Sequence, residues 1–162
     1  MRVAESGARA FFLDTNILVY AFSAQDAAKR ATARTFAETE GAHVSTQVLS
    51  ELANVLTRRF GISARETRER ILNIANACEV VQVTPAIVLD ALRIMERFHF
   101  GFFDSQIIAS ALSAGASVLY TEDLQHGQVL DGSLTIRSPF AVRAEQPRRR
   151  YRSKARAAGP RT

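Results

Sequence analysis

The stretch FFLDTNILVYAF, residues 11–22, decides the fold, because a strand pattern and a helix pattern meet in it at a carboxylate. The short apolar run at 10–13 is typical of a buried strand, and residues 15–22 continue with the spacing of an apolar helix. Asp14 lies at the junction, and burying an unpaired carboxylate is costly. A cap on the following helix is its simplest role, and a partner for its charge is the alternative.

The bulk composition is that of an ordinary globular domain. The chain has 162 residues, of which 47% are apolar and 23% are charged. No apolar run approaches the roughly 18 residues that span a bilayer, and the first residues lack the apolar core of a secretory signal. The lone cysteine, Cys78, excludes an internal disulfide framework. We therefore expect one cytoplasmic domain over 1–142 with no membrane segment.

The basic character of the protein is confined to its C-terminal end. Residues 143–162 hold eight Arg or Lys and one Glu, for a net charge of +7, whereas residues 1–142 hold 13 basic and 15 acidic residues, for a net charge of −2. A polar block of like charge predicts a disordered tail. Such a tail either attracts nucleic acid phosphates or is a solvating extension without a partner.

Strands and helices alternate along the rest of the chain. After the first strand, we expect strands at 42–45, 79–83, 117–121 and 134–138, and helices at 15–22, 27–39, 46–60, 63–77, 85–98 and 104–115. No hairpin signal separates the first four strands. The order predicts an α/β fold whose mainly parallel sheet of about five strands is covered by helices on both faces.

Four acidic residues occupy unusual places in this arrangement. Asp14 and Asp123 each follow a strand, at the sheet edge where ligands bind in such folds. Glu51 borders the apolar stripe of the helix that leaves the same edge. Asp104 opens a later helix, and topology alone does not settle where it points. Taken singly, these acids have ordinary explanations as helix caps, a solvated helix edge and a turn residue.

Gathered together, these carboxylates would repel one another and raise their own pKa values unless a cation neutralised them. Oxygen ligands without supporting His or Cys suit Mg²⁺ or Mn²⁺. Such an ion can activate water and stabilise the leaving oxygen of a phosphodiester.

Four motifs, in order, resemble the PIN-domain family and within it the VapC-type toxins of bacterial toxin–antitoxin pairs. They are FFLDTNILVYAF at 11–22, TQVLSELANVL at 46–56, FFDSQIIASAL at 102–112 and SVLYTEDLQHG at 117–127. The resemblance runs from about Phe11 to Phe140 and implies a three-layer α/β/α sandwich. It also implies a Mg²⁺- or Mn²⁺-dependent endoribonuclease that acts as a homodimer and is inhibited by a small antitoxin lying across its groove.

The same resemblance assigns the site residues. It implies that Asp14, Glu51, Asp104 and Asp123 are the catalytic metal ligands, so that Asp104 reaches the cluster. It further implies that Asn16 orients Asp14 or a water molecule, and that Thr121 supports Asp123. The extra acid Glu122 would point the opposite way if its strand persisted. No second small-molecule cofactor site is expected.

Two other functions are compatible with the residues. A phosphotransferase or phosphatase could form an aspartyl-phosphate on Asp14, although the DTN stretch lacks the second Asp of the haloacid-dehalogenase pattern. A non-catalytic module could use the acids to hold a cation or a basic partner.

If the protein is a ribonuclease, a basic patch should help it to bind RNA. The candidates for this patch are Arg58, Arg59 and Arg97, although a solvated helix end is the simpler explanation of each.

Overall fold

A computed structural model describes residues 8–140 of the chain. The predicted tail at 143–162 lies outside these residues. The strands are β1 (Phe11–Leu13), β2 (Ala42–Ser45), β3 (Glu79–Val81), β4 (Val118–Tyr120), β5 (Val129–Leu130) and β6 (Leu134–Arg137). The helices are α1 (Thr15–Phe22), α2 (Ala27–Glu38), α3 (Thr46–Arg58), α4 (Ala64–Ala77), α5 (Pro85–Phe98) and α6 (Phe102–Ser113).

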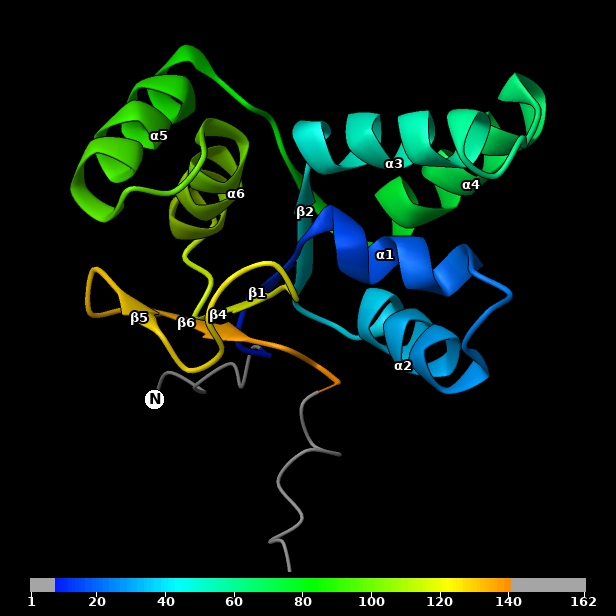
Figure 1. Ribbon diagram of the computed structural model, residues 1–162, viewed down its shortest axis with the longest axis horizontal. Coiled ribbons are helices and arrows are strands. Elements are labelled where there is room, and N and C mark those ends of the chain that lie inside the picture. Colours follow the sequence, from blue (N-terminus) through cyan, green and yellow to red (C-terminus); the bar gives the residue numbers. More distant parts are fainter. Residues whose placement is uncertain (1–7, 141–162) are drawn as a thin grey trace, which may run out of the picture.

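The strands form one sheet in the order β3-β2-β1-β4-β6-β5, with β1 at its centre (Figure 1). Every pairing is parallel except that between β5 and β6. In the register of the central strands, Phe12 stands opposite His43 on β2 and opposite Leu119 on β4. The carboxyl ends of β1, β2 and β4 therefore meet at one edge.

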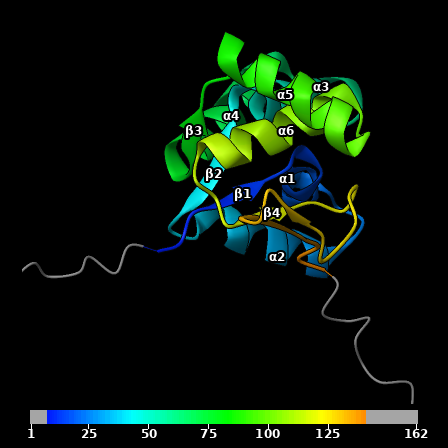
Figure 2. The ribbon, with the colours of Figure 1, turned by 90° about the vertical axis from the view of Figure 1, so that its left-hand side faces the viewer.

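Helices cover both faces of the sheet, as Figure 2 shows with α3, α5 and α6 on one side and α2 on the other. The central strands are buried on both faces, since Phe12, Leu13, Val44 and Leu119 are fully shielded from solvent. This explains why the strands read as continuous apolar runs rather than alternating ones. The predicted α/β class with a mainly parallel sheet and helices on both faces is confirmed.

The sheet has one more strand than the sequence pattern indicated. β5 is two residues long and pairs with β6 through a turn at Asp131 and Gly132, whose φ angles are +48° and +67°. An Asp-Gly pair is a strong signal for this kind of hairpin, because both residues must adopt positive φ. A two-residue strand is too short to show a periodic pattern, so the sequence pattern missed it.

Several local signals worked as predicted. Asp26, Ser63 and Thr84 cap the helices α2, α4 and α5 by accepting hydrogen bonds from backbone N–H groups in the first turns.

Between residues 8 and 140, no helix is both long enough and apolar enough to cross a membrane. Cys78 is buried, and burial raises the pKa of its thiol to about 11.

Candidate active site

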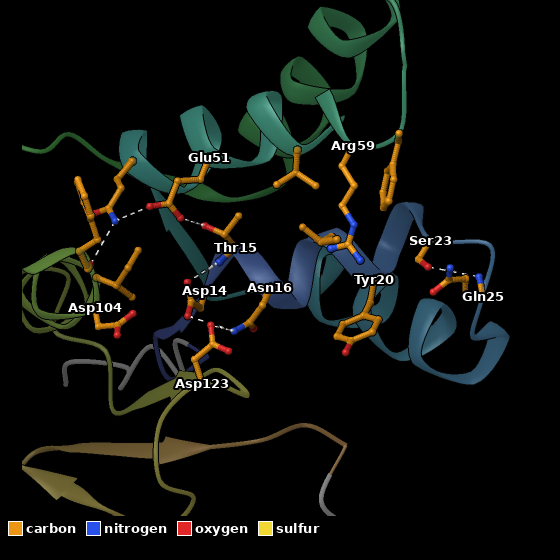
Figure 3. Close-up of a pocket in the computed structure, with 16 residues that line it drawn as sticks. Asp14, Thr15, Asn16, Tyr20, Ser23, Gln25, Glu51, Arg59, Asp104 and Asp123 are labelled. Atoms are coloured by element: carbon orange, nitrogen blue, oxygen red, sulfur yellow. Dashed lines mark hydrogen bonds between the residues drawn. The ribbon is translucent and has the colours of Figure 1, made fainter. Parts of the chain in front are cut away.

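A groove of about 560 Å³ lies where the carboxyl edge of the sheet meets α1, α3 and α6 (Figure 3). All four acids singled out in the sequence contribute to its lining: Asp14, Glu51, Asp104 and Asp123. Three of them come from the ends of strands or the first turns of helices at the carboxyl edge, and Glu51 comes from the second turn of α3. The predicted convergence of these side chains on one groove is what the structure contains.

Asp14 is the most buried of the four acids, with 7% of its surface exposed. Its Oδ1 accepts a hydrogen bond from the Thr15 N–H at 2.6 Å, and its Oδ2 accepts one from the Thr121 hydroxyl at 2.8 Å. Burial raises the pKa of Asp14 to about 6, these hydrogen bonds oppose the rise, and the charges of Asp123 and Glu51 add to it. Asp14 is thus both the cap of α1 and a groove carboxylate whose pKa is raised.

Asn16 and Thr121 tie Asp14 to Asp123. The Asn16 side-chain amide donates to Asp123 Oδ2 at 2.8 Å, to Thr121 Oγ1 at 3.2 Å and, more weakly, to Asp14 Oδ2 at 3.4 Å. The Thr121 hydroxyl also accepts the Asp123 N–H at 3.1 Å. These contacts fix the turn after β4 against the first turn of α1. Asn16 and Thr121 therefore lie beside the acids that they are expected to support.

Glu51 is held by two residues that the sequence did not single out. The Thr15 hydroxyl donates to Glu51 Oε2 at 2.7 Å, and the Gln47 side-chain amide donates to Glu51 Oε1 at 2.8 Å. Gln47 in turn accepts a hydrogen bond from the Gln106 amide at 2.6 Å. The side chain is partly buried, so the reading of Glu51 as a solvated helix edge is wrong.

Asp104 lies in the first turn of α6, where Gly101 is the capping residue. The expectation that this helix begins at Asp104 is therefore wrong, and so is the simpler reading of Asp104 as its cap. Topology explains why Asp104 reaches the groove. The Ser117 N–H donates to Ala10 O at 3.0 Å, so α6 ends at the amino edge of β1 and β4, and its 12 residues carry its start about 18 Å away to the carboxyl edge.

The electrostatics of Asp104 match this placement. Partial burial raises its pKa first, and the charges of Asp123 and Glu51 raise it further. Its carboxylate accepts no hydrogen bond from any residue between 8 and 140. Asp104 is therefore the acid whose oxygens remain free to turn toward a ligand.

Glu122 faces away from the other acids. Its carboxylate pairs with Lys29 at 2.9 Å and accepts a hydrogen bond from the Tyr20 hydroxyl at 2.7 Å. Lys29 also lies over the Tyr20 ring, 4.5 Å from its centroid, and over that of Phe140. Glu122 thus anchors the loop that carries Asp123 to α1 and α2. Because β4 ends at Tyr120, the alternation of side chains along a strand does not set this direction.

The donor chemistry of the acidic cluster fits a hard divalent cation, because it consists of carboxylate oxygens whose mutual repulsion a cation would offset. In the described part of the chain, however, no three Asp, Glu, His or Cys side chains are close enough together to form a ready ligand shell. Asp123 is exposed and accepts a hydrogen bond from Asn16, and Asp104 is half-buried, whereas two or more hydrogen bonds hold each of Asp14 and Glu51. A bound ion would be held by carboxylate oxygens of these four residues.

Sequence reasoning did not single out four supporting residues: Thr15, Tyr20, Lys29 and Gln47. Each makes its hydrogen bond either to a residue 9 to 102 positions away in the sequence or to a residue of the same helix. None of the four belongs to a spacing pattern that marks a site. Only Thr15 carried a usable signal, since it adjoins Asp14 at the start of α1.

Comparisons with known structures find the same fold. VapC20 of Mycobacterium tuberculosis, described as a sarcin-ricin loop cleaving toxin, is 23% identical, with 70% of this chain and 90% of that chain covered and a TM-score of 0.58. A toxin–antitoxin complex from Klebsiella pneumoniae is 19% identical, with 81% and 98% covered and a TM-score of 0.60. DNA-bound VapBC from Salmonella typhimurium is 18% identical, with 82% and 99% covered and the same TM-score of 0.60.

The comparison with curated proteins finds no significant match. A family model described as the PIN domain matches residues 11–129, which include all four acids and both supporting residues, Asn16 and Thr121. This span runs from the first residue of β1 to the first residue of β5. The chain belongs to the PIN domain family.

Proposed function

We propose that this protein is a Mg²⁺- or Mn²⁺-dependent endoribonuclease that hydrolyses RNA phosphodiesters as the toxin of a toxin–antitoxin pair. The observation that carries the proposal is the convergence of Asp14, Glu51, Asp104 and Asp123 on one groove, with a buried Asp14 whose pKa is raised to about 6. An oxygen-only cluster under mutual repulsion is the kind of site that takes a hard divalent ion. The cytoplasm, where RNA is found, is the compartment that we propose for this activity.

A bound Mg²⁺ or Mn²⁺ would supply charge neutralisation at the scissile phosphate and acidify water. The residues of the chain do the rest. Asp14 is held by three hydrogen bonds and Glu51 by two, and they give fixed oxygens on one wall of the groove. Asp104, whose carboxylate accepts no hydrogen bond from residues 8–140, takes the proton of the attacking water, and the Asn16 amide holds the Asp123 carboxylate in the groove.

RNA cleavage by purified protein tests the proposal. The wild type should cleave a labelled single-stranded RNA in Mg²⁺ or Mn²⁺, and Asp104→Asn should lower the rate by at least about 10³-fold. Asp90→Asn is the matched control, because Asp90 is exposed on α5 and, among residues 8–140, pairs only with Arg93, at 3.1 Å. Equal cleavage by the two variants would exclude a catalytic role for the acidic cluster.

The toxin role rests on the likeness to VapC20 and to the Klebsiella and Salmonella complexes, and its test is cellular. Expression should arrest growth, and co-expression of a small neighbouring gene product should relieve the arrest. Asp104→Asn should express to the same level without arresting growth. An arrest that survives this substitution would contradict the link between toxicity and RNA cleavage.

We also propose that the protein forms a homodimer through α5. Leu89, Leu92 and Met95 leave 67%, 47% and 40% of their surfaces exposed on this helix, at a spacing of three residues. Light scattering should give a dimer mass for the wild type and a monomer mass for Leu92→Glu. Leu72→Glu is the control, because Leu72 is 57% exposed on α4.

A further inference from the structure

The end of the groove away from the acids carries a single base. Arg59 is the only Lys or Arg among the described residues that line the groove. It follows α3 as the C-capping residue, with its N–H donating to Val55 O at 2.9 Å. Figure 3 shows its side chain directed down into the groove toward α1, at the level of Tyr20, while the acids gather at the other end. The groove is therefore acidic at one end and basic at the other.

The Arg59 guanidinium has no anionic partner within the described structure. None of the ion pairs between residues 8 and 140 includes it, and its nearest recorded aromatic contact is the Phe60 ring, with 5.9 Å between guanidinium carbon and ring centroid. Arg97, another basic candidate from the sequence, is instead paired with Asp131 at 2.6 Å. Arg58 occupies the last turn of α3 and does not line the groove.

A role at the helix terminus does not account for this placement. A base near the C-terminus of a helix is favourable because it offsets the helix dipole, and Arg58 already provides that charge. Arg59 adds a second guanidinium that faces the cavity. A guanidinium in such a position matches the fork geometry of a phosphate group.

We propose that Arg59 binds a backbone phosphate of the RNA strand, at a nucleotide displaced from the bond that is cut at the acidic end. This inference rests on the proposed ribonuclease function. α1 separates the two ends, since Asp14 caps its start and Ser23 its end, and its eight residues span about 12 Å. An RNA strand lying along α1 therefore extends beyond one nucleotide and brings a second phosphate to Arg59.

Tyr20 gives this end of the groove a fixed wall. Its hydroxyl donates to Glu122 and accepts a hydrogen bond from Lys29 Nζ at 3.2 Å, and its ring packs edge-on against Phe140 with 5.1 Å between centroids. A ring held at three points loses little conformational freedom when a nucleotide settles against it. The phosphate contact and the fixed wall together define a subsite.

A protein segment would have to change the sign of its charge along its length to fit both ends of the groove. A segment that covered the four acids would have to be basic there, and Arg59 would repel any basic continuation of it. An RNA strand carries phosphates throughout, and these suit Arg59 directly and the acids once a divalent cation is bound. The charge pattern of the groove therefore favours RNA as the occupant.

Binding of a short fluorescein-labelled single-stranded RNA, measured by anisotropy in an Asp14→Asn background that prevents cleavage, tests the subsite. Arg59→Gln should weaken binding about 10-fold at low salt and reduce the slope of log affinity against log salt by about 0.7, the value for one phosphate contact on a single strand. Arg59→Lys should restore the salt slope and part of the affinity. Arg58→Gln removes the same charge one residue away. It should leave the RNA affinity and the salt slope close to those of the Asp14→Asn protein.

Steady-state kinetics in the otherwise wild-type protein separate binding from chemistry. The effect of Arg59→Gln should fall mainly on KM. If Arg59→Gln and Arg58→Gln behave alike while the wild type cleaves RNA, the subsite is refuted and the ribonuclease stands. If the wild type neither binds nor cleaves RNA, both proposals fall. If Arg59→Gln spares RNA binding and weakens only antitoxin binding, the occupant is the protein partner and the proposal is wrong.

Discussion

The two ends of the groove are built in opposite ways. At the acidic end, the Asp14 side chain is 7% exposed and belongs to a hydrogen-bond network that joins α1, α3 and the turn after β4. At the other end, Arg59 is exposed and unpaired within the described structure. The acidic end has its geometry imposed by the fold, whereas Arg59 is left free to meet a ligand.

This difference separates two kinds of work. A reacting centre gains from groups that are held in place before the substrate arrives, because little reorganisation is then needed during the reaction. A contact remote from the reaction needs charge and reach more than rigidity. The two ends should therefore respond differently to substitution, to pH and to salt.

The largest contrast should appear in the kinetic constants. Asp14→Asn should lower kcat by at least about 10³-fold, because it removes the buried charge on which the acidic end depends. Arg59→Gln should act mainly on KM, as argued above. Single-turnover and steady-state RNA cleavage measure both. A loss confined to KM in Asp14→Asn would remove the distinction between the ends.

When no cation is bound, the acidic end should lower the free energy of unfolding of the protein. Asp14 has a pKa raised to about 6, so the folded state holds its proton more tightly than the unfolded chain does. Its contribution to the free energy of unfolding therefore falls as pH rises from about 4 to about 6, by roughly 3 kcal/mol in all. Urea unfolding of metal-free wild type and Asp14→Asn across this range should give a stability difference that grows in favour of the variant. A difference independent of pH would contradict the raised pKa.

Removing one support should weaken the acidic end without abolishing it. Thr121→Val keeps the shape of the side chain but deletes the hydroxyl that donates to Asp14 and accepts the Asp123 N–H. Outer hydrogen bonds of this kind are worth about 10- to 100-fold in metal affinity. Calorimetric titration with Mn²⁺ measures the loss. Thr57→Val, which removes a hydroxyl bonded to Ala53 O on α3, is the control and should bind Mn²⁺ as the wild type does.

The smallest effect on RNA cleavage should come from Glu122, which anchors the loop that carries Asp123. Glu122→Gln breaks the partly exposed ion pair with Lys29 but can keep a hydrogen bond to Tyr20. Exposed pairs contribute about 0–1 kcal/mol, so we expect no more than a few-fold loss in RNA cleavage. A loss as large as that of Asp104→Asn would make Glu122 a member of the acidic cluster.

The sequence predicted the acidic end better than the basic end for a physical reason. Asp14 and Asp123 follow buried strands, and strand order alone brings the ends of such strands together. The position of Asp104 could not be derived from strand order, because it depends on the course of α6 and on where that helix ends. Arg59 carried no signal that distinguished it from Arg58, because one position at the end of α3 decides which side chain enters the groove. Gln47 could not be predicted for a similar reason, since its hydrogen bonds to Glu51 and Gln106 depend on how α3 packs against α6.

Binding of Mn²⁺ is the most direct test of the claim that the acidic end is a metal site. Titration calorimetry at neutral pH should give saturable binding to the wild type and at least about 10-fold weaker binding to both Asp14→Asn and Asp104→Asn. Asp90→Asn should bind Mn²⁺ as the wild type does. Absence of saturable binding by the wild type, or equal affinity in all four proteins, would contradict the account.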